Sequence, residues 1–506
     1  MNLQIKGRFY IIASALMALF LGALDTLIMS AAMPSIVADL GGLDLYSWVF
    51  SAYLLSRAVS LPIFGKLADL FKTKNLFLFS VAMFILSSLL AGVSVSMTQL
   101  IVARVVQGIG AGGCFALVTI VLSEVSTPEK RGKMLSLGSF VWGLASVLGP
   151  PIGGFIVYYF SWQWIFYMNI PLGSISFLGI CLYFKETRQK RSDVSIDGWG
   201  ITTLSVTILS LLTAFLLTGQ GTPWHSLKII GLFVLTVLTG IGFFYVEKRA
   251  KEPVLPVEFF SVRGFKIGNC AVFFSSFAVF SIVAYSPLFI QGALGETPVQ
   301  LGMVMLALSL AWSAGALICG QVAHRIGSKP NAIGGAFLIL FGSAMALAFT
   351  ASTPLIFCYI ALSLAGMGMG FSSISTLLVV QSSLEEKDLG VATSSQQFAR
   401  TLGGTIGVGV TGSIAIGRIT EGMDRFITSG ATGSVSMDLI HRIRGNVENL
   451  FQSDVQSLIP APVLLPLREI VSSGIWIVFL FALMASILSL ILSFRLPGKK
   501  EEYNKG

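Results

Sequence analysis

The sequence predicts an all-α polytopic membrane protein with fourteen transmembrane helices. Of its 506 residues, 54% are hydrophobic and 11% are charged, whereas a water-soluble domain has about 25% charged residues. Apolar runs of about 20 residues, the length that crosses a bilayer as a helix, recur along most of the chain. This recurrence favours one polytopic bundle over several soluble domains.

The apolar runs divide into fourteen expected spans. Their limits are 9–30, 47–66, 76–93, 98–122, 134–158, 162–184, 198–218, 226–246, 264–290, 300–322, 331–350, 354–380, 391–417 and 470–494. The first span follows Lys6 and Arg8, as a signal-peptide core would. Its length of about 20 residues exceeds that of such a core, and further spans follow, so we interpret it as a retained helix.

The basic residues predict how the spans are oriented. With a cytoplasmic N-terminus, 24 of the 33 Lys and Arg residues fall on the inner side and 6 on the outer side. The remaining three, Arg57, Arg104 and Arg400, lie within spans. Because short cytoplasmic loops are enriched in Lys and Arg, both termini are predicted to be cytoplasmic. The net charge of +9 therefore reflects membrane topology and does not indicate nucleic-acid binding.

An internal repeat predicts two related halves. A shift of 258 positions places Gly108, Gly110, Gly112, Gly132 and Gly149 on Gly366, Gly368, Gly370, Gly390 and Gly407. We expect a six-helix bundle over 1–190, two inserted helices over 191–260, and a second six-helix bundle over 261–506. Parallel six-helix halves are typical of transporters, with the substrate site between them.

One expected outer segment, 418–469, is much longer than the other turns. It has mixed charge and three prolines, Pro460, Pro462 and Pro466. We interpret it as a partly ordered outer loop. The alternative is an amphipathic helix that lies on the surface and contacts outer-leaflet lipid.

Asp25 and Arg104 are charged residues inside predicted spans. Each lies about six residues from the outer end of its helix, so we expect them at similar depth. A buried carboxylate without a partner tends to hold a proton, and a neighbouring arginine favours its charged form. Such a pair can exchange a proton for a structural change. The alternative is a static salt bridge between two helices.

Arg57 and Arg400 also lie within spans, where a charged residue is kept only if it faces protein or water. Either could balance Asp25 or bind an anionic group of a substrate. For Arg57 structural pairing is an equal alternative, and for Arg400 structural pairing is favoured. One deep acid facing two or three deep arginines favours a neutral or anionic amphiphile over a dication as cargo.

The segment from Gly65 to Lys74 ends the second span with Asp69 between Lys66 and Lys72. Composition alone favours an ordinary turn on the positively charged inner side. The alternative is a latch in which the acid binds the N-terminus of a neighbouring helix.

Several motifs resemble those of the major facilitator superfamily, and within it the fourteen-span drug:proton antiporters. Leu24-Asp25-Thr26 resembles the first-span motif, Arg104-Val105-Val106-Gln107-Gly108 the fourth-span motif, and Gly149-Pro150-x-x-Gly153-Gly154 the fifth-span motif associated with antiporters. Gly65 to Lys74 resembles the inner-gate loop, although Leu70, Lys72 and Thr73 depart from its usual residues. Gly320 to Lys329 echoes that loop, with His324 in place of the acid.

This resemblance implies a proton-coupled antiporter that exports lipophilic or amphiphilic compounds by alternating access. Asp25 and Arg104 would couple, and Gly65, Asp69, Lys72 and Lys74 would form the gate. The segment Gly149-Pro150-x-x-Gly153-Gly154 would form a bend and seal. Tyr53, Arg57, Gln107, Trp142 and Arg400 are the expected cavity residues.

Two alternatives differ in function. The same scaffold could export a lipid or glycolipid, with 418–469 receiving it, or the chain could be a non-transporting sensor or a membrane enzyme. Proton symport is disfavoured by the fifth-span motif. The sequence shows no nucleophile–base arrangement, metal cluster or phosphate-binding loop, so we expect no cofactor and no enzymatic activity. We expect a monomer in the cell membrane, whose partners are a small amphiphile, protons and lipid.

Overall fold

A computed structural model describes residues 7–40, 45–185, 197–219, 222–250, 253–429 and 461–498. All regular secondary structure in these residues is helical. Fourteen of the described helices are long and apolar enough to cross a membrane, which confirms the predicted number. Helices satisfy their backbone hydrogen bonds internally, as the interior of a bilayer requires.

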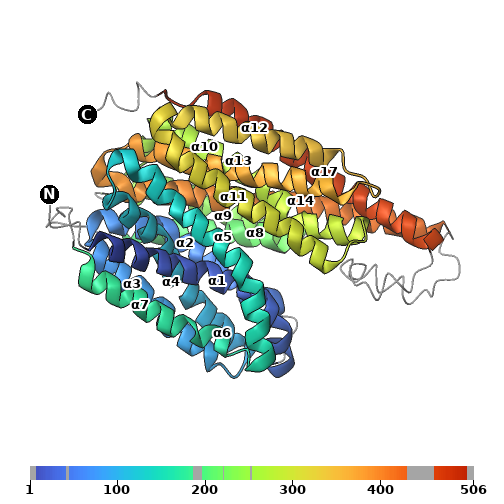
Figure 1. The fold of residues 1–506 in the computed structure, drawn as a ribbon, viewed down its shortest axis with the longest axis horizontal. Helices are drawn as coiled ribbons and strands as arrows, with labels where there is room; N and C mark the ends of the chain where they lie inside the picture. The colour runs from blue at the N-terminus through green and yellow to red at the C-terminus, as the bar shows by residue number, and fades with distance from the viewer. Residues whose placement is uncertain are drawn as a thin grey trace.

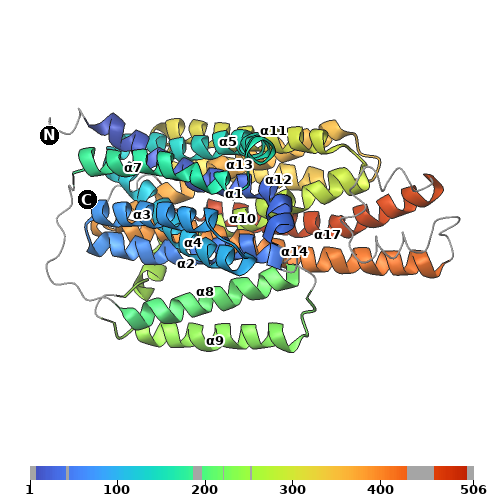
Figure 2. The ribbon, with the colours of Figure 1, turned by 90° about the horizontal axis from the view of Figure 1, so that it is seen from below.

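The helices form two bundles with a hairpin on one flank (Figure 1, Figure 2). The first bundle contains α1 (Arg8–Leu40), α2 (Tyr46–Leu70), α3 (Thr73–Gly92), α4 (Met97–Glu124), α5 (Pro128–Tyr159), α6 (Trp164–Tyr167) and α7 (Asn169–Tyr183). The second contains α10 (Arg263–Pro287) with the π-helix η3 (Leu288–Ala293), α11 (Pro298–Ile326), α12 (Ser328–Leu347), α13 (Leu355–Ser382), α14 (Leu389–Thr428) and α17 (Ala461–Phe494). α1 begins and α17 ends at the same end of the molecule (Figure 1).

The repeated glycines are contact points between helix backbones. A Cβ atom on Gly110 of α4 would lie 2.8 Å from the backbone nitrogen of Phe84 on α3, and one on Gly368 of α13 would lie 2.6 Å from the carbonyl oxygen of Gly335 on α12. No hydrophobic effect pulls helices together in lipid, so small residues that permit close packing hold them instead. The glycines that repeat in the sequence therefore make equivalent helix–helix contacts in the two bundles.

Two further glycine pairs join the bundles to each other. Gly65 of α2 contacts Gly390 of α14, and Gly132 of α5 contacts Gly320 of α11. Both contacts lie near the end of the molecule that carries Asp69, called here the Asp69 end, which the charge distribution predicts to be cytoplasmic. The bundles meet at this end and spread apart toward the opposite end (Figure 1).

The inserted helices α8 (Gly198–Gly219) and α9 (Leu227–Glu247) form a hairpin beside the two bundles (Figure 2). α8 packs on both α2 and α14 and so covers the seam between the bundles. Hydroxyl pairs join the hairpin, such as Ser210 with Thr236 at 2.8 Å. Only 6% of the apolar window of α9 is buried inside the molecule, so most of this helix is left to face lipid.

The long outer segment is shorter than the sequence predicts. α14 continues to Thr428, beyond the expected limit of 417, and α17 begins at Ala461 instead of 470. The two helices therefore project past the others (Figure 2). Polar residues at positions 418–428 set the expected limit, but a helix can continue beyond the apolar span. The remaining part, 430–460, lies outside the described residues.

Candidate functional site

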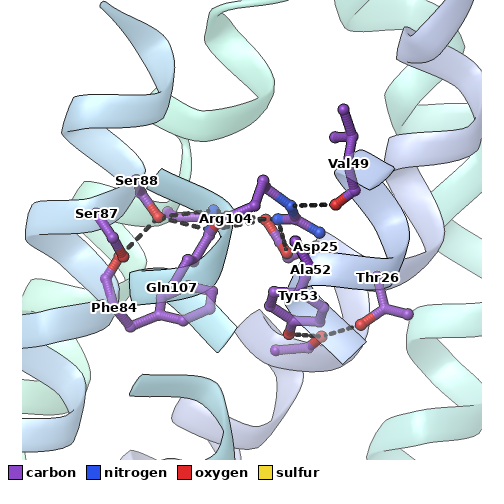
Figure 3. Close-up of polar contacts among 12 residues, drawn as sticks. Asp25, Thr26, Val49, Ala52, Tyr53, Phe84, Ser87, Ser88, Arg104 and Gln107 are labelled. Carbon is purple, nitrogen blue, oxygen red and sulfur yellow. Dashed lines mark hydrogen bonds and ion pairs between the residues drawn. The ribbon is translucent and has the colours of Figure 1, made fainter. Parts of the chain in front are cut away.

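Asp25 of α1 and Arg104 of α4 form an ion pair inside the first bundle (Figure 3). The Arg104 Nη1 atom lies 2.6 Å from Asp25 Oδ2. Only 2% of Asp25 and 1% of Arg104 is exposed. The two charges therefore compensate each other away from water.

Gln107, one turn further along α4, hydrogen-bonds both members of this ion pair. Its Nε2 donates to Asp25 Oδ1 at 2.9 Å, and its Oε1 accepts a hydrogen bond from Arg104 Nη1 at 2.7 Å. The expected cavity residue Gln107 is thus fully buried with the ion pair and does not line the cavity described below.

Two residues that the sequence did not single out belong to the same cluster. Asn169, at the start of α7, donates to Asp25 Oδ1 at 3.3 Å and to Ser88 Oγ of α3 at 3.2 Å. Ser88 also accepts from Gln107 at 2.9 Å. The only signal in the sequence was that each is a polar residue within an apolar run, a feature shared with many residues that merely pack.

Tyr53 of α2 separates the ion pair from a cavity. The Arg104 guanidinium carbon lies 4.1 Å from the centre of the Tyr53 ring, and Arg104 Nε donates to the Val49 carbonyl at 3.5 Å. The Tyr53 hydroxyl donates to the Gly22 carbonyl of α1 at 3.3 Å. Figure 3 shows Tyr53 beside Arg104 and Asp25. Five helices thus meet at one polar cluster.

This geometry can link a proton to helix packing. Protonation of Asp25 would remove its negative charge and leave Arg104 buried without a counter-ion. Removing one partner of a buried ion pair costs about 3–5 kcal/mol, so protonation would favour a different arrangement of the helices around the cluster.

A small cavity lies on the other side of Tyr53. Its lining includes three of the expected residues, Tyr53, Arg57 and Trp142, together with Phe115 and Cys114. The Arg57 guanidinium carbon lies 4.7 Å from the centre of the Phe115 ring and 5.4 Å from that of Trp142. The cavity therefore combines a cation with an aromatic surface.

Arg400 approaches the same aromatic ring from the second bundle. Its guanidinium carbon lies 5.5 Å from the centre of the Phe115 ring. Among the described residues, no carboxylate pairs with Arg400 or with Arg57. In the described part of the chain both arginines therefore pack on aromatic rings and not on a carboxylate.

The predicted gate residues lie where α2 meets α14. Asp69 accepts hydrogen bonds from the backbone N–H groups of Gly390 and Val391, each at 2.8 Å. These are the first turn of α14, where the helix dipole favours a negative charge. Lys74 donates to the Cys181 carbonyl at 2.6 Å, whereas Lys72 is exposed at the start of α3.

The fifth-span motif lies within one continuous helix, α5. A Cβ atom on Gly149 would lie 2.9 Å from the Leu27 side chain of α1, so this glycine permits close packing. Gly153 is buried, whereas Gly154 is exposed, and a Cβ atom on Gly154 would have no neighbour within 4 Å. The Pro150 side chain lies outside the described part of the chain.

Known proteins resemble this chain over nearly its whole length. A family model for the Major Facilitator Superfamily matches residues 15–408. Multidrug transporter protein MdtP of Bacillus subtilis (strain 168) is 33% identical over 98% of this chain and 95% of its own length. Multidrug resistance protein 3 of the same organism is 32% identical over 95% of this chain and 94% of its own length.

Solved structures share the fold at low sequence identity. The human organic anion transporter MFSD10 (TETRAN) has a TM-score of 0.61 and 15% identity, covering 97% of this chain and 99% of that one. The proton:xylose symporter XylE has a TM-score of 0.59 and 14% identity, covering 96% and 95%. The sequence and fold together show a multi-pass membrane transporter rather than an enzyme, and the chain belongs to the major facilitator superfamily.

Proposed function

We propose that the protein is a proton-coupled antiporter that exports lipophilic or amphiphilic compounds by alternating access. The observation that carries this proposal is the buried Asp25–Arg104 ion pair, separated from a cavity by the single side chain of Tyr53. A charged cluster this deep is costly and marks function in a membrane protein. The names of the relatives, multidrug transporter and multidrug resistance protein, support export of drug-like compounds.

In this proposal, the proton and the cargo act on the same helices. A proton on Asp25 weakens its attachment to Arg104 and loosens α1 from α4. Tyr53 contacts both Arg104 and the cavity, so movement of Arg104 changes the cavity wall. Cargo and proton then favour different packing of the first bundle, which is the condition for exchanging one for the other.

Alternating access further requires that the Asp69 end open and close. In the present arrangement this end is closed by the contact of Asp69 with α14 and by the two glycine pairs between the bundles. The other end, where the bundles spread apart, is the predicted extracellular side. We assign this arrangement to the outward-facing half of the cycle.

Transport into proteoliposomes tests the proposal. An acid-inside pH gradient should drive accumulation of at least one dye from a panel of ethidium (cationic), N-phenyl-1-naphthylamine (neutral) and 8-anilinonaphthalene-1-sulfonate (anionic). Asp25→Asn should abolish this gradient-driven accumulation while dye exchange without a gradient persists. The retained exchange shows that the variant is folded.

Asp39→Asn is the matched control. Asp39 lies on the same helix, is exposed, and accepts a hydrogen bond from Trp162 Nε1 at 2.9 Å, which asparagine can also accept. This variant should transport as the wild type does. Gradient-driven accumulation by Asp25→Asn at the wild-type rate would refute the coupling role. Transport of lipid alone, with no dye transported, would favour the lipid exporter.

A further inference from the structure

Two arginines lie at the aromatic wall of the cavity beside Tyr53, of which Arg57 lines the cavity and Arg400 contacts the Phe115 ring. Arg57 comes from the first bundle and Arg400 from the second, and each guanidinium lies near the Phe115 ring. Because their distances to the ring centre are 4.7 and 5.5 Å, the two guanidinium carbons are at most 10.2 Å apart, the sum of those distances. Both side chains are partly exposed.

The internal repeat places the two arginines at one level of the molecule. Arg400 occupies the position 258 residues after Trp142, the ring that Arg57 contacts. The gate loops align Gly65 with Gly320, a shift of 255 positions, and this shift aligns Arg57 with Trp312. Each bundle thus contributes one arginine and one tryptophan at exchanged positions, and the two arginines both lie near the Phe115 ring.

The acid of the first bundle does not neutralise these cations. Asp25 already accepts hydrogen bonds from Arg104, Gln107 and Asn169, and Tyr53 lies between it and the cavity. No acidic residue is among the described residues that line the cavity. An uncompensated arginine within a membrane span is costly, and a bound anion would offset that cost.

We infer that Arg57 and Arg400, whose guanidinium groups both lie near the Phe115 ring, bind one anionic group of an amphiphilic cargo, a carboxylate, sulfonate or phosphate, when the small cavity beside Tyr53 widens during the transport cycle. The planar guanidinium forms charge-assisted hydrogen bonds of about 2.8 Å to such oxygens. The 10.2 Å upper bound includes separations at which one oxyanion accepts hydrogen bonds from both guanidinium groups. The apolar body of the cargo packs on Phe115, Trp142 and Leu19, which line the cavity.

The Trp142 side chain offers a further donor. Its indole N–H is buried and has no hydrogen-bond partner among the described residues, although buried polar groups are normally paired. Trp142 lines the cavity and lies beside Arg57. A polar atom of the cargo would satisfy this N–H. The inference rests on the proposed export function for its physiological meaning, but the binding site can be tested without transport.

Two dyes that differ in one group test the inference. 8-Anilinonaphthalene-1-sulfonate carries a sulfonate that N-phenyl-1-naphthylamine lacks, and both fluoresce in apolar surroundings. Binding is measured by titration of the full chain in phosphatidylcholine nanodiscs, with empty nanodiscs subtracted. The wild type should bind the sulfonate more tightly. Arg57→Gln and Arg400→Gln should each weaken sulfonate binding roughly tenfold to a hundredfold, as loss of a charge-assisted hydrogen bond does, and leave the neutral dye within about twofold.

Arg425→Gln is the matched control, because Arg425 is an exposed arginine on the same helix as Arg400, near Glu421. It removes the same net charge and should leave both dyes unaffected. Three results would overturn the inference. The Arg57 and Arg400 variants could lose both dyes equally, they could bind the sulfonate as the wild type does, or the wild type could fail to bind the sulfonate.

A second arm identifies the source of the anion. If phosphatidylglycerol in the nanodisc competes with the sulfonate in the wild type but not in Arg57→Gln, a lipid head group occupies the same site. If it does not compete, the site serves soluble amphiphiles. Proton-linked transport is measured separately, so failure of the export proposal would leave a positive binding result intact.

Discussion

Gln107 holds the buried ion pair together from both sides. Its amide oxygen accepts from Arg104 and its amide nitrogen donates to Asp25 and Ser88. No apolar side chain can replace these contacts. At the scale of single residues, the charge pair therefore depends on a neutral residue that satisfies both partners at once.

Replacement of this amide should destabilise the protein. Gln107→Leu leaves buried polar groups of Asp25, Arg104 and Ser88 with one fewer partner, and each unsatisfied buried group costs about 1–3 kcal/mol. We expect a lower free energy of unfolding and a lower melting temperature in detergent. Gln99→Leu is the control, because Gln99 is exposed on the same helix and its side chain accepts from the Val95 N–H. Equal melting temperatures for the two variants would contradict the role of Gln107.

The contact of α2 with α14 is the clearest link between the bundles at the scale of elements. Asp69 satisfies two N–H groups that the first turn of a helix otherwise leaves without partners, and Gly65 lets the two backbones touch. On the other side, Gly320 of α11 touches Gly132 of α5 in the same way, with His324 in the place of Asp69. Both contacts between the bundles are made by glycine pairs, but an aspartate accompanies the first and a histidine the second.

Removal of the Asp69 side chain should loosen the start of α14. A helix cap contributes about 0.5–2 kcal/mol, so Asp69→Ala should accelerate hydrogen exchange of the Gly390 and Val391 amides by roughly 2- to 30-fold. Mass spectrometry of peptides covering these residues measures the rate. Glu385→Ala removes an exposed acid in the adjacent turn and should leave it unchanged. Equal exchange in both variants would show that Asp69 does not hold this helix.

For the whole molecule, the sequence predicted the features that repeat or that carry charge. Apolar length predicted fourteen spans, and the glycine repeat predicted contacts that recur in both bundles. It also placed Asp25 and Arg104 at one depth, and they form an ion pair. Charge and small size are properties of a residue type and can be recognised without knowing its neighbours.

The neutral parts of the site could not be predicted in this way. Asn169 and Ser88 join the cluster only because α7 and α3 pack beside α4. Gln107 was expected in the cavity, but its position on α4 turns it toward Asp25. The limits of the outer segment were also wrong, because α14 and α17 extend beyond their apolar spans. Each of these features depends on how helices pack, which one sequence pattern does not determine.

If Asp25 links proton movement to cargo movement, a cargo gradient alone should move protons through the protein. Proteoliposomes containing a lumenal pH indicator are loaded with the panel dye that the wild type transports fastest, and no pH or electrical gradient is imposed. Dye leaving through the wild type should draw protons inward and acidify the lumen, whereas Asp25→Asn should release dye without acidification. Acidification by Asp25→Asn equal to that of the wild type would show that Asp25 does not link the two movements.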